Sequence, residues 1–291
     1  MTNVGIVGTG MLGEAVGLHL LDVGYEVTVF NRTKEKTKKL EDKGAKVVDS
    51  PKQVAENSDL IIIVVRDAEA VNDVIFGDLG IILGKHDRIC IADMSTVNPN
   101  STKEISEKVT EHKVDYIEIP VMGGPNVAID GKLVVMASGN KEVFSRYKEV
   151  LEKIGEQVFY LGKTGTAHSI KLAMNLQIAM LALSLSEGIT LTKNAGFDPE
   201  IFLKILNSTY FKTGMSENKA YKMAKGSYEP TFTLANLKKD LDTINDTADS
   251  IDTELPMAKI ARKVYEDAIS AGFSDIDYTG IIAYIKKLSE K

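Results

Sequence analysis

The sequence predicts an α/β protein in which a doubly wound sheet is followed by an all-helical domain. Short β-branched runs alternate with helical stretches through the first half of the chain, and after about residue 163 the strands stop. A βαβα order predicts a parallel sheet covered by helices on both faces. The length of 291 residues also suggests two domains. We therefore expect one domain over residues 1–163 and a second over 164–291.

The expected strands are short apolar runs between polar turns. The runs "GIVG" (5–8) and "LIIIVV" (60–65) are continuously apolar rather than alternating, which is typical of strands buried on both faces. In chain order, the expected strands cover residues 3–8, 26–31, 45–50, 59–65, 88–93, 115–120, 131–139 and 157–162.

The expected helices divide into two groups. In the first half they lie between the strands, at residues 12–24, 34–44, 68–76, 101–112 and 141–155. In the second half they follow one another, at residues 165–194, 198–208, 214–225, 233–250 and 256–271, with a short one near the end. Prolines in "FDPE", "YEPT" and "ELP" mark helix starts in this second group.

The net charge and the cysteine count argue against several classes of function. A formal charge of −6 without a long basic run argues against nucleic-acid binding as the main role. The single cysteine, Cys90, lies in an apolar run and fits a core residue, so no intramolecular disulfide is expected. Together with an N-terminus that does not resemble a signal peptide, this predicts a cytoplasmic protein. Because Lys171, Asn175 and Gln177 interrupt the longest apolar stretch, we expect no membrane span.

A dinucleotide site is predicted at the first strand-to-helix turn. Gly8, Gly10 and Gly13 have G-x-G-x-x-G spacing directly after a strand and at the start of a helix. The first glycine permits a tight turn, the second lets the backbone approach a pyrophosphate, and the third lets helix and strand pack closely. The alternative is an ordinary glycine-rich turn. The predicted cofactor loop is Gly8, Thr9, Gly10, Met11, Leu12 and Gly13.

The end of the second strand favours NADP(H) over NAD. An NAD site usually has an acidic residue at this point to bind the ribose 2′-hydroxyl. Here the chain has the neutral Asn31, then Arg32 and Thr33. The arginine can pair with a 2′-phosphate, and its neighbours can donate or accept hydrogen bonds. The alternative is that Arg32 is a solvated surface charge.

The long helix from residue 165 carries two polar residues in an apolar context. Lys171 and Asn175 are one helical turn apart and so share a face. The helix begins at the joint between the expected domains, where small-molecule sites are common. The alternative is that the Lys171 stem lies along apolar surface and its ammonium reaches water.

The chain resembles the β-hydroxyacid dehydrogenase family, which includes 3-hydroxyisobutyrate dehydrogenases and glyoxylate/succinic semialdehyde reductases. The resemblance covers nearly the whole chain, and "NRT" (31–33) is similar to the NADPH-dependent glyoxylate/succinic semialdehyde reductase branch. It implies a Rossmann domain followed by a 6-phosphogluconate dehydrogenase-like helical domain. Five segments in the family's order carry it: "GIVGTGMLG" (5–13), "ADMSTVNP" (92–99), "IPVMGG" (119–124), "GTAHSIKLAMN" (165–175) and "FTLANLKKDL" (232–241).

The resemblance implies a catalytic pair and a substrate segment. Lys171 would be the general acid in reduction and the base in the reverse direction, and Asn175 would bind substrate or hold Lys171. Met122, Gly123 and Gly124 would bind the substrate carboxylate, chiefly through backbone N–H groups. The family's usual serine is Met122 here, which removes a hydroxyl contact and favours a longer or more apolar substrate. Thr96 and Phe232 would complete the substrate site.

Further cofactor contacts are implied at three other places. Val64 and Val65 would pass beside the cofactor, Ser95 and Thr96 would lie near the nicotinamide ribose, and Lys239 would reach it from the helical domain. Asp240 would support the segment around Lys239. Two alternatives come from the residues themselves: a Ser-Thr pair before "VNP" fits a helix cap, and "KKD" fits a solvated helix face.

These observations predict an NADPH-dependent reductase of short aldehyde acids, reversible as a 3-hydroxyacid dehydrogenase. The alternatives are an imine reductase and a non-catalytic NADP-binding protein. The expected ligand is a small aldehyde acid or hydroxyacid, with no nucleic acid and no membrane as partner. The helical domain suggests self-association, and the resemblance implies a homodimer or homotetramer. We expect no metal site, because His19, His86, His112 and His168 are scattered, and we interpret His168 as structural or as lying at the rim of the cleft.

Overall fold

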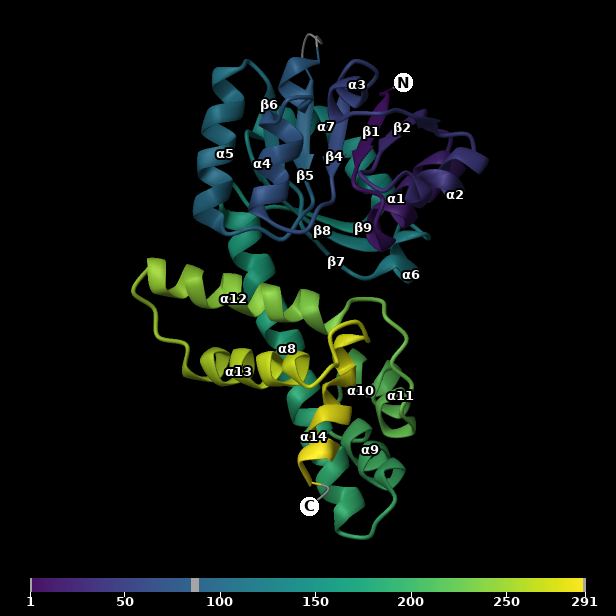
Figure 1. The fold of residues 1–291 in the computed structure, drawn as a ribbon, viewed down its shortest axis with the longest axis vertical. Coiled ribbons are helices and arrows are strands. Elements are labelled where there is room, and N and C mark those ends of the chain that lie inside the picture. Colours follow the sequence, from purple (N-terminus) through teal and green to yellow (C-terminus); the bar gives the residue numbers. More distant parts are fainter. Residues whose placement is uncertain (1, 85–88, 290–291) are drawn as a thin grey trace. The chain divides into compact units, whose positions relative to one another are not determined.

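The computed structural model describes residues 2–84 and 89–289, which form two compact units. The first unit, residues 1–171, is α/β, and the second, residues 172–291, is helical (Figure 1). The division falls inside helix α8, Thr166–Asn194, and so lies beyond the expected boundary at 163/164. The reason is that the first turn of α8 is hydrogen-bonded to strands of the first unit.

Six parallel strands form the main part of the sheet, in the order β3-β2-β1-β4-β5-β6. The chain therefore reverses direction across the sheet between β1 and β4, and in open α/β sheets ligands bind beside such a point. In register, Ile6 of β1 lies between Val29 of β2 and Ile62 of β4. The strands are β1 Val4–Val7, β2 Val27–Phe30, β3 Lys46–Val47, β4 Leu60–Ile63, β5 Cys90–Asp93 and β6 Asp115–Glu118.

The far end of the sheet is not parallel, which corrects the expected all-parallel arrangement. After β6 the chain passes through β7, Val121–Met122, and returns as β8, Leu133–Gly139, antiparallel to both. β9, Gly155–Tyr160, then pairs parallel to β8. Helix α6, Pro125–Ala128, is the only helix in this connection and is too short to cross a sheet face, so the chain turns back along the edge.

Helices cover both faces of the sheet, as predicted. Alternate residues of β4 show this, because Ile62 packs in one apolar cluster with α1 and α7, whereas Ile63 packs in a second with α4 and α5. Strand β5 starts after Arg88, which lies outside the described residues. Besides α6 and the start of α8, the helices described in this unit are α1 Met11–Asp22, η1 Lys34–Thr37, α2 Lys38–Asp42, α3 Pro51–Ala55, α4 Ala68–Phe76, η2 Ile81–Leu83, α5 Pro99–Glu111 and α7 Lys141–Ile154.

One apolar cluster of the second unit contains Leu237, Leu241 and Tyr265, and another contains Leu203 and Met223. The expected helix at 214–225 is divided at Lys219, whose ammonium binds the Asp277 carboxylate at 3.2 Å. Besides the rest of α8, the unit contains α9 Pro199–Asn207, α10 Gly214–Asn218, α11 Ala220–Lys225, α12 Leu234–Ser250, α13 Pro256–Ser270, η3 Tyr278–Gly280 and α14 Ile281–Ser289.

Helix α8 differs from the expectation that polar residues leave no segment apolar enough to span a membrane. Judged by length and composition alone, Thr166–Asn194 is long and apolar enough to cross a membrane, with a mean hydropathy of 1.4 in its most apolar window. The polar residues at 171, 175 and 177 are too few to lower that average. One such helix is weak evidence, because core helices of soluble proteins have the same length and composition. Within the protein, 39% of this window is buried.

Candidate active site

The glycine-rich loop has the geometry that the sequence predicts for a pyrophosphate site. Gly8 has φ +100°, and a side chain there would also collide with the carbonyl oxygen of Val64. A Cβ on Gly13 would collide with the carbonyl oxygen of Gly8, so α1 packs against the loop only without a side chain. Gly10 precedes α1, and a Cβ there would meet nothing within 4 Å. The N-terminus of α1 therefore faces open space, where backbone N–H groups favour an anion.

Asn31 fixes the glycine-rich loop to the end of β2. Its Oδ1 accepts a hydrogen bond from the backbone N–H of Thr9 at 3.0 Å, and its Nδ2 donates to the carbonyl oxygen of Thr33 at 2.9 Å. The next side chain, Arg32, is exposed and pairs with no acidic side chain in the described parts of the chain. The site thus presents a cation beside a neutral amide, the pattern expected for a 2′-phosphate.

The ends of β4 and β5 are tied together by Ser95. Its hydroxyl oxygen accepts a hydrogen bond from the backbone N–H of Val65 at 3.1 Å, and its own N–H donates to Oδ1 of Asp93 at 2.9 Å. Ser95 and Thr96 are not the helix cap that was the alternative explanation, because Asn98 caps α5. Val64 lies beside Gly13, within the same loop region. The segments at 64–65 and 95–96 therefore meet at the carboxyl edge of the sheet.

A buried network at this edge holds the first turn of α8. The Glu118 carboxylate, at the end of β6, accepts hydrogen bonds from the backbone N–H groups of Gly165 and His168, the latter at 3.0 Å. Its Oε2 also lies 3.2 Å from Nδ1 of His168, and both side chains are fully buried. Ser138 of β8 accepts from the N–H of Ala167 at 3.1 Å. His168 is structural, one of the two interpretations given above, but it lies in the interior rather than at a rim.

The pKa values of Glu118 and His168 are shifted in opposite directions, and each shift favours the charged form of its group. Burial raises the pKa of the Glu118 carboxyl, but the hydrogen bond and charge of His168, with the N–H groups of Gly165 and His168, hold it below its ordinary value of 4.5. Burial lowers the pKa of His168, but the hydrogen bond to Glu118 and the charge of Asp93 raise it above 6.5. Both directions favour the ionised forms at neutral pH.

This pair predicts a specific pH dependence of stability. Since the Glu118 pKa is lowered, its contribution is present above about pH 4.5 and is lost as pH falls through its folded pKa. Since the His168 pKa is raised, its contribution is complete below about pH 6.5 and is lost as pH rises through its folded pKa. Urea unfolding of wild type and Glu118→Gln should therefore differ by about 2 kcal/mol between these pH values and by less on either side. A difference that stays constant from pH 4 to 10 would contradict an ionic pair.

Lys171 lies beside the predicted substrate segment. Its Nζ is 3.4 Å from Sδ of Met122 in β7, and Met122 is half-buried. Gly123 has φ +118°, and a Cβ there would lie 2.6 Å from Cγ2 of Val127, so only glycine fits this turn. Gly124 follows and caps α6. The predicted proton donor and the predicted carboxylate-binding turn are therefore adjacent, with a thioether at the point where the family has a hydroxyl.

In the helical unit, Asp240 connects two of the predicted site residues. Its Oδ2 accepts from Nδ2 of Asn175 at 2.6 Å, and its Oδ1 lies 2.6 Å from Nζ of Lys239. The Asn175 amide oxygen is buried and has no hydrogen-bond partner within residues 2–84 and 89–289. Phe232 packs edge-to-face on Tyr278, with ring centroids 6.0 Å apart. Asn175 is thus oriented by Asp240 and keeps an acceptor oxygen for a ligand.

Glu118, Ser138 and Asp93 were not predicted as part of the site. A carboxylate at the end of a buried strand is the signal that could have identified Glu118 and Asp93, whereas nothing local to Ser138 marks it. No group of His, Cys, Asp and Glu residues suited to a metal ion occurs in the described part of the chain. His86 lies outside that part.

The comparisons with known proteins match both units. Residues 3–162 match the family described as the NAD-binding domain of 6-phosphogluconate dehydrogenase. Residues 165–285 match the NAD-binding domain of NADP-dependent 3-hydroxyisobutyrate dehydrogenase.

Individual relatives are similar over nearly the whole chain. Glyoxylate/succinic semialdehyde reductases 1 and 2 (the latter chloroplastic) of Arabidopsis thaliana are each 31% identical, over 97% and 98% of this chain and 98% and 79% of their own. A crystal structure of 3-hydroxyisobutyrate dehydrogenase from Salmonella typhimurium superposes with a TM-score of 0.88 at 26% identity, covering 98% of this chain and all of that one.

Proposed function

Because this chain belongs to the β-hydroxyacid dehydrogenase family, we propose that it reduces short aldehyde acids with NADPH and oxidises the corresponding hydroxyacids in reverse. The family consists of NAD(P)-dependent oxidoreductases, and the Rossmann unit carries the dinucleotide loop. The preference for NADPH rests on Asn31 and the exposed Arg32 at the end of β2. The observation that carries the proposal is Lys171 Nζ beside the Met122–Gly124 turn.

The chain's own groups divide the remaining work of reduction. When bound, the reduced nicotinamide supplies the hydride for the carbonyl carbon. Lys171 donates a proton to the carbonyl oxygen and stabilises the negative charge that develops there. The backbone N–H groups at Gly123 and Gly124 bind the substrate carboxylate, since small residues leave them accessible. Asn175 is oriented by Asp240, and its amide oxygen accepts a hydrogen bond from the bound ligand.

Met122 predicts which aldehyde acids the enzyme prefers. A thioether is a weak acceptor and no donor, so it offers little to a substrate hydroxyl and packs well against a methyl group. Methylmalonate semialdehyde and tartronate semialdehyde differ in this way at C2. We expect the wild type to prefer the methyl compound, and Met122→Ser to shift the ratio of kcat/KM values about 10-fold toward the hydroxyl compound.

The test follows NADPH oxidation with glyoxylate, succinic semialdehyde, methylmalonate semialdehyde and tartronate semialdehyde, with NADH in parallel. Turnover of at least one of them, faster with NADPH, supports the proposal. Tight NADPH binding without turnover of any would refute it and direct the search to cyclic imines or to a non-catalytic role. An unchanged substrate ratio in Met122→Ser would remove Met122 from the specificity argument.

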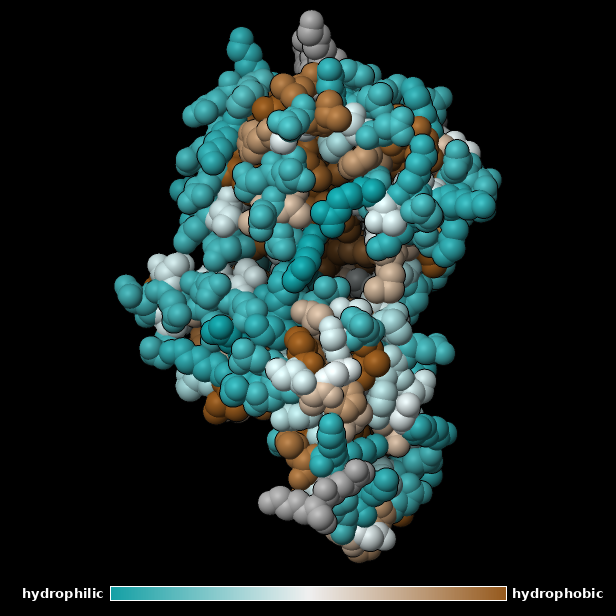
Figure 2. All heavy atoms as spheres, in the orientation of Figure 1, coloured by the Kyte–Doolittle hydropathy of each residue, from teal (hydrophilic) through white to brown (hydrophobic). Residues whose placement is uncertain are grey.

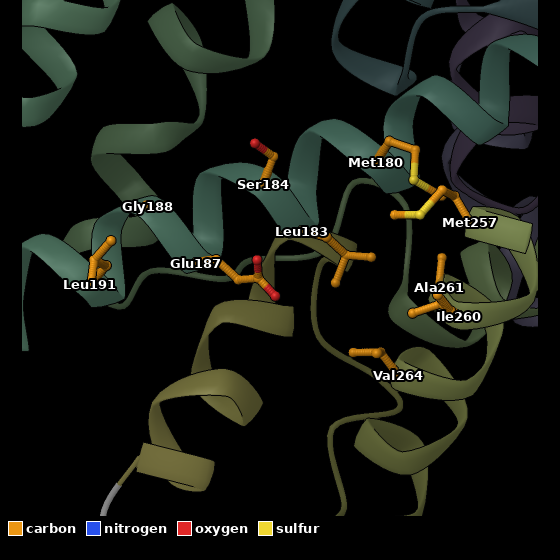
Figure 3. Close-up of a pocket in the computed structure, with 10 residues that line it drawn as sticks. All are labelled: Met180, Leu183, Ser184, Glu187, Gly188, Leu191, Met257, Ile260, Ala261 and Val264. Carbon is orange, nitrogen blue, oxygen red and sulfur yellow. The ribbon is translucent and has the colours of Figure 1, made fainter.

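We also infer that the helical unit associates with a second copy of the chain. An apolar groove runs between α8 and α13, lined mainly by Met180, Leu183, Leu191, Met257, Ile260 and Val264 (Figure 3). Leu191 is 72% exposed and Ile260 56%, and apolar patches interrupt the hydrophilic surface of this unit (Figure 2). Exposed apolar surface of this kind is typical of subunit interfaces. A groove formed by two long helices suits a symmetric pairing of identical helices.

Association through this groove predicts that Ile260→Asp yields a monomer. A buried aspartate without a partner in an apolar interface costs several kcal/mol, enough to dissociate a micromolar dimer. Light scattering after size exclusion would measure the mass. Ile251→Asp is the matched control, because Ile251 is 61% exposed and lies outside the groove. A wild-type monomer, or an Ile260→Asp oligomer, would contradict the inference.

A further inference from the structure

We propose that Glu118 and His168 position Lys171 for proton transfer by fixing the first turn of α8 to the carboxyl edge of the sheet. The proposal rests on the proposed function, in which Lys171 is the proton donor. Neither residue touches the reacting atoms in this proposal, so both are positioning residues. Three observations carry it: the capping of α8, the contacts of the His168 ring, and the spacing between His168 and Lys171.

The N-terminus of α8 is capped by side chains from two strands rather than by its own residues. Glu118 accepts hydrogen bonds from the N–H groups of Gly165 and His168, and Ser138 accepts from that of Ala167. These N–H groups at a helix start have no partner within the helix. A carboxylate there also interacts favourably with the positive end of the helix dipole. Glu118 therefore fixes where a helix of 29 residues begins.

The His168 ring connects the same turn to two further elements. Nε2 donates to the carbonyl oxygen of Ser95 at 2.9 Å, and Nδ1 lies 2.8 Å from Oγ1 of Thr102. The Thr102 hydroxyl donates to the carbonyl oxygen of Asn98 at 3.2 Å, so it accepts from the ring. Both ring nitrogens are then donors, which is the imidazolium form. The single Nδ1–H is shared between Thr102 and the Glu118 carboxylate, which balances the charge of the ring. The assignment of the ring protons follows from these partners.

The ring thereby links the cofactor segment to the lysine. Ser95, whose carbonyl oxygen holds the ring, also holds the N–H of Val65 through its hydroxyl. Lys171 follows His168 by three residues and so lies on the same side of the helix, one turn on. A shift of this turn displaces the ammonium relative to the segments at 64–65 and 95–96. Misplacement by about 1 Å is enough to cost roughly 100-fold in rate.

The first experiment compares His168→Gln with His19→Gln. Glutamine keeps one donor but carries no charge, so α8 remains capped by Glu118 while the ionic link is lost. We expect kcat to fall roughly 10- to 100-fold, with the KM for NADPH changed by less than about 3-fold. The primary isotope effect with 4-deuterated NADPH should rise, because hydride and proton transfer become rate-limiting. The control fits because the His19 ring nitrogens also contact two carbonyl oxygens, of Ile129 and Lys153, but hold α1 instead.

A second measurement does not depend on turnover. Amide hydrogen exchange of the peptide containing residues 165–171 should speed up at least about 10-fold in Glu118→Gln, because Gly165 and His168 lose a charged acceptor. If the wild type turns over no aldehyde acid, the proposed function fails, whereas this exchange still tests whether Glu118 fixes the first turn of α8. Thr102→Val removes the hydroxyl that accepts from the ring and donates to the Asn98 carbonyl oxygen, and it leaves both Glu118 and His168 in place. It serves if the other variants fold poorly, and it should lower kcat by about 3-fold.

The outcomes separate positioning from general damage to the fold. A lower kcat with a raised isotope effect and faster exchange at 165–171 supports the proposal. An unchanged kcat in His168→Gln overturns it, as does a loss of kcat with an unchanged isotope effect, which indicates only less folded enzyme. Exchange in Glu118→Gln equal to that of wild type also overturns it.

Discussion

Replacing Lys171 with alanine should lower kcat for aldehyde reduction by about 10⁴-fold. The substitution removes both the proton donor and the positive charge that stabilises the developing alkoxide. NADPH binding should stay within about 2-fold of wild type, because the groups that bind the dinucleotide lie elsewhere. The glycine-rich loop joins β1 to α1, and Arg32, which pairs with the 2′-phosphate, follows β2. Steady-state kinetics gives the first quantity, and NADPH fluorescence titration gives the second.

Two further measurements make this result specific to Lys171. Lys163→Ala removes an exposed cation shortly before the same helix and should leave kcat unchanged. Methylamine should partly restore turnover to Lys171→Ala, because a small ammonium fits the space that the side chain leaves next to Met122. Unchanged kcat in Lys171→Ala would mean that another group protonates the substrate.

Local patterns in the sequence predicted much of the fold. Continuous apolar runs located β1 and β4, because strands buried on both faces need no polar alternation. By contrast, β7 is only Val121–Met122, too short for any periodicity, and it is defined by its pairing with β8. The helix expected at 214–225 divides at Lys219, whose ammonium contacts Asp277, 58 residues further along the chain, a pairing that the local sequence does not contain.

In the candidate site too, local patterns predict some features, and contacts between distant segments determine the others. The roles of the glycines follow from spacing, and the structure bears out the close approaches at Gly8 and Gly13. Glu118 meets the start of α8 across 47 residues of chain, and Ser138 meets it across 29. Such pairings depend on the order of strands in the sheet, so helix propensity and spacing within one segment do not predict them.

Replacing Asn31 and Arg32, the two residues at the end of β2, should reverse the preference for NADPH over NADH. We expect the double variant Asn31→Asp/Arg32→Ala to lower the ratio of kcat/KM for NADPH over NADH by roughly 10³-fold. Aspartate keeps the acceptor that binds the Thr9 N–H, so the glycine-rich loop should retain its position. Its charge repels a 2′-phosphate and accepts from a ribose 2′-hydroxyl. The loss of Arg32 removes the cation that pairs with that phosphate.

Three comparisons decide whether these residues carry the preference. Arg262→Ala, which removes an exposed arginine paired with Asp242 in the helical unit, should leave the ratio unchanged. The single variant Arg32→Ala should account for part of the effect and should make NADPH binding less sensitive to salt, because an ionic contact to phosphate is lost. If the double variant kept its preference for NADPH, the 2′-phosphate would be bound by other cations, and the neutral Asn31 would serve only to hold the Thr9 N–H.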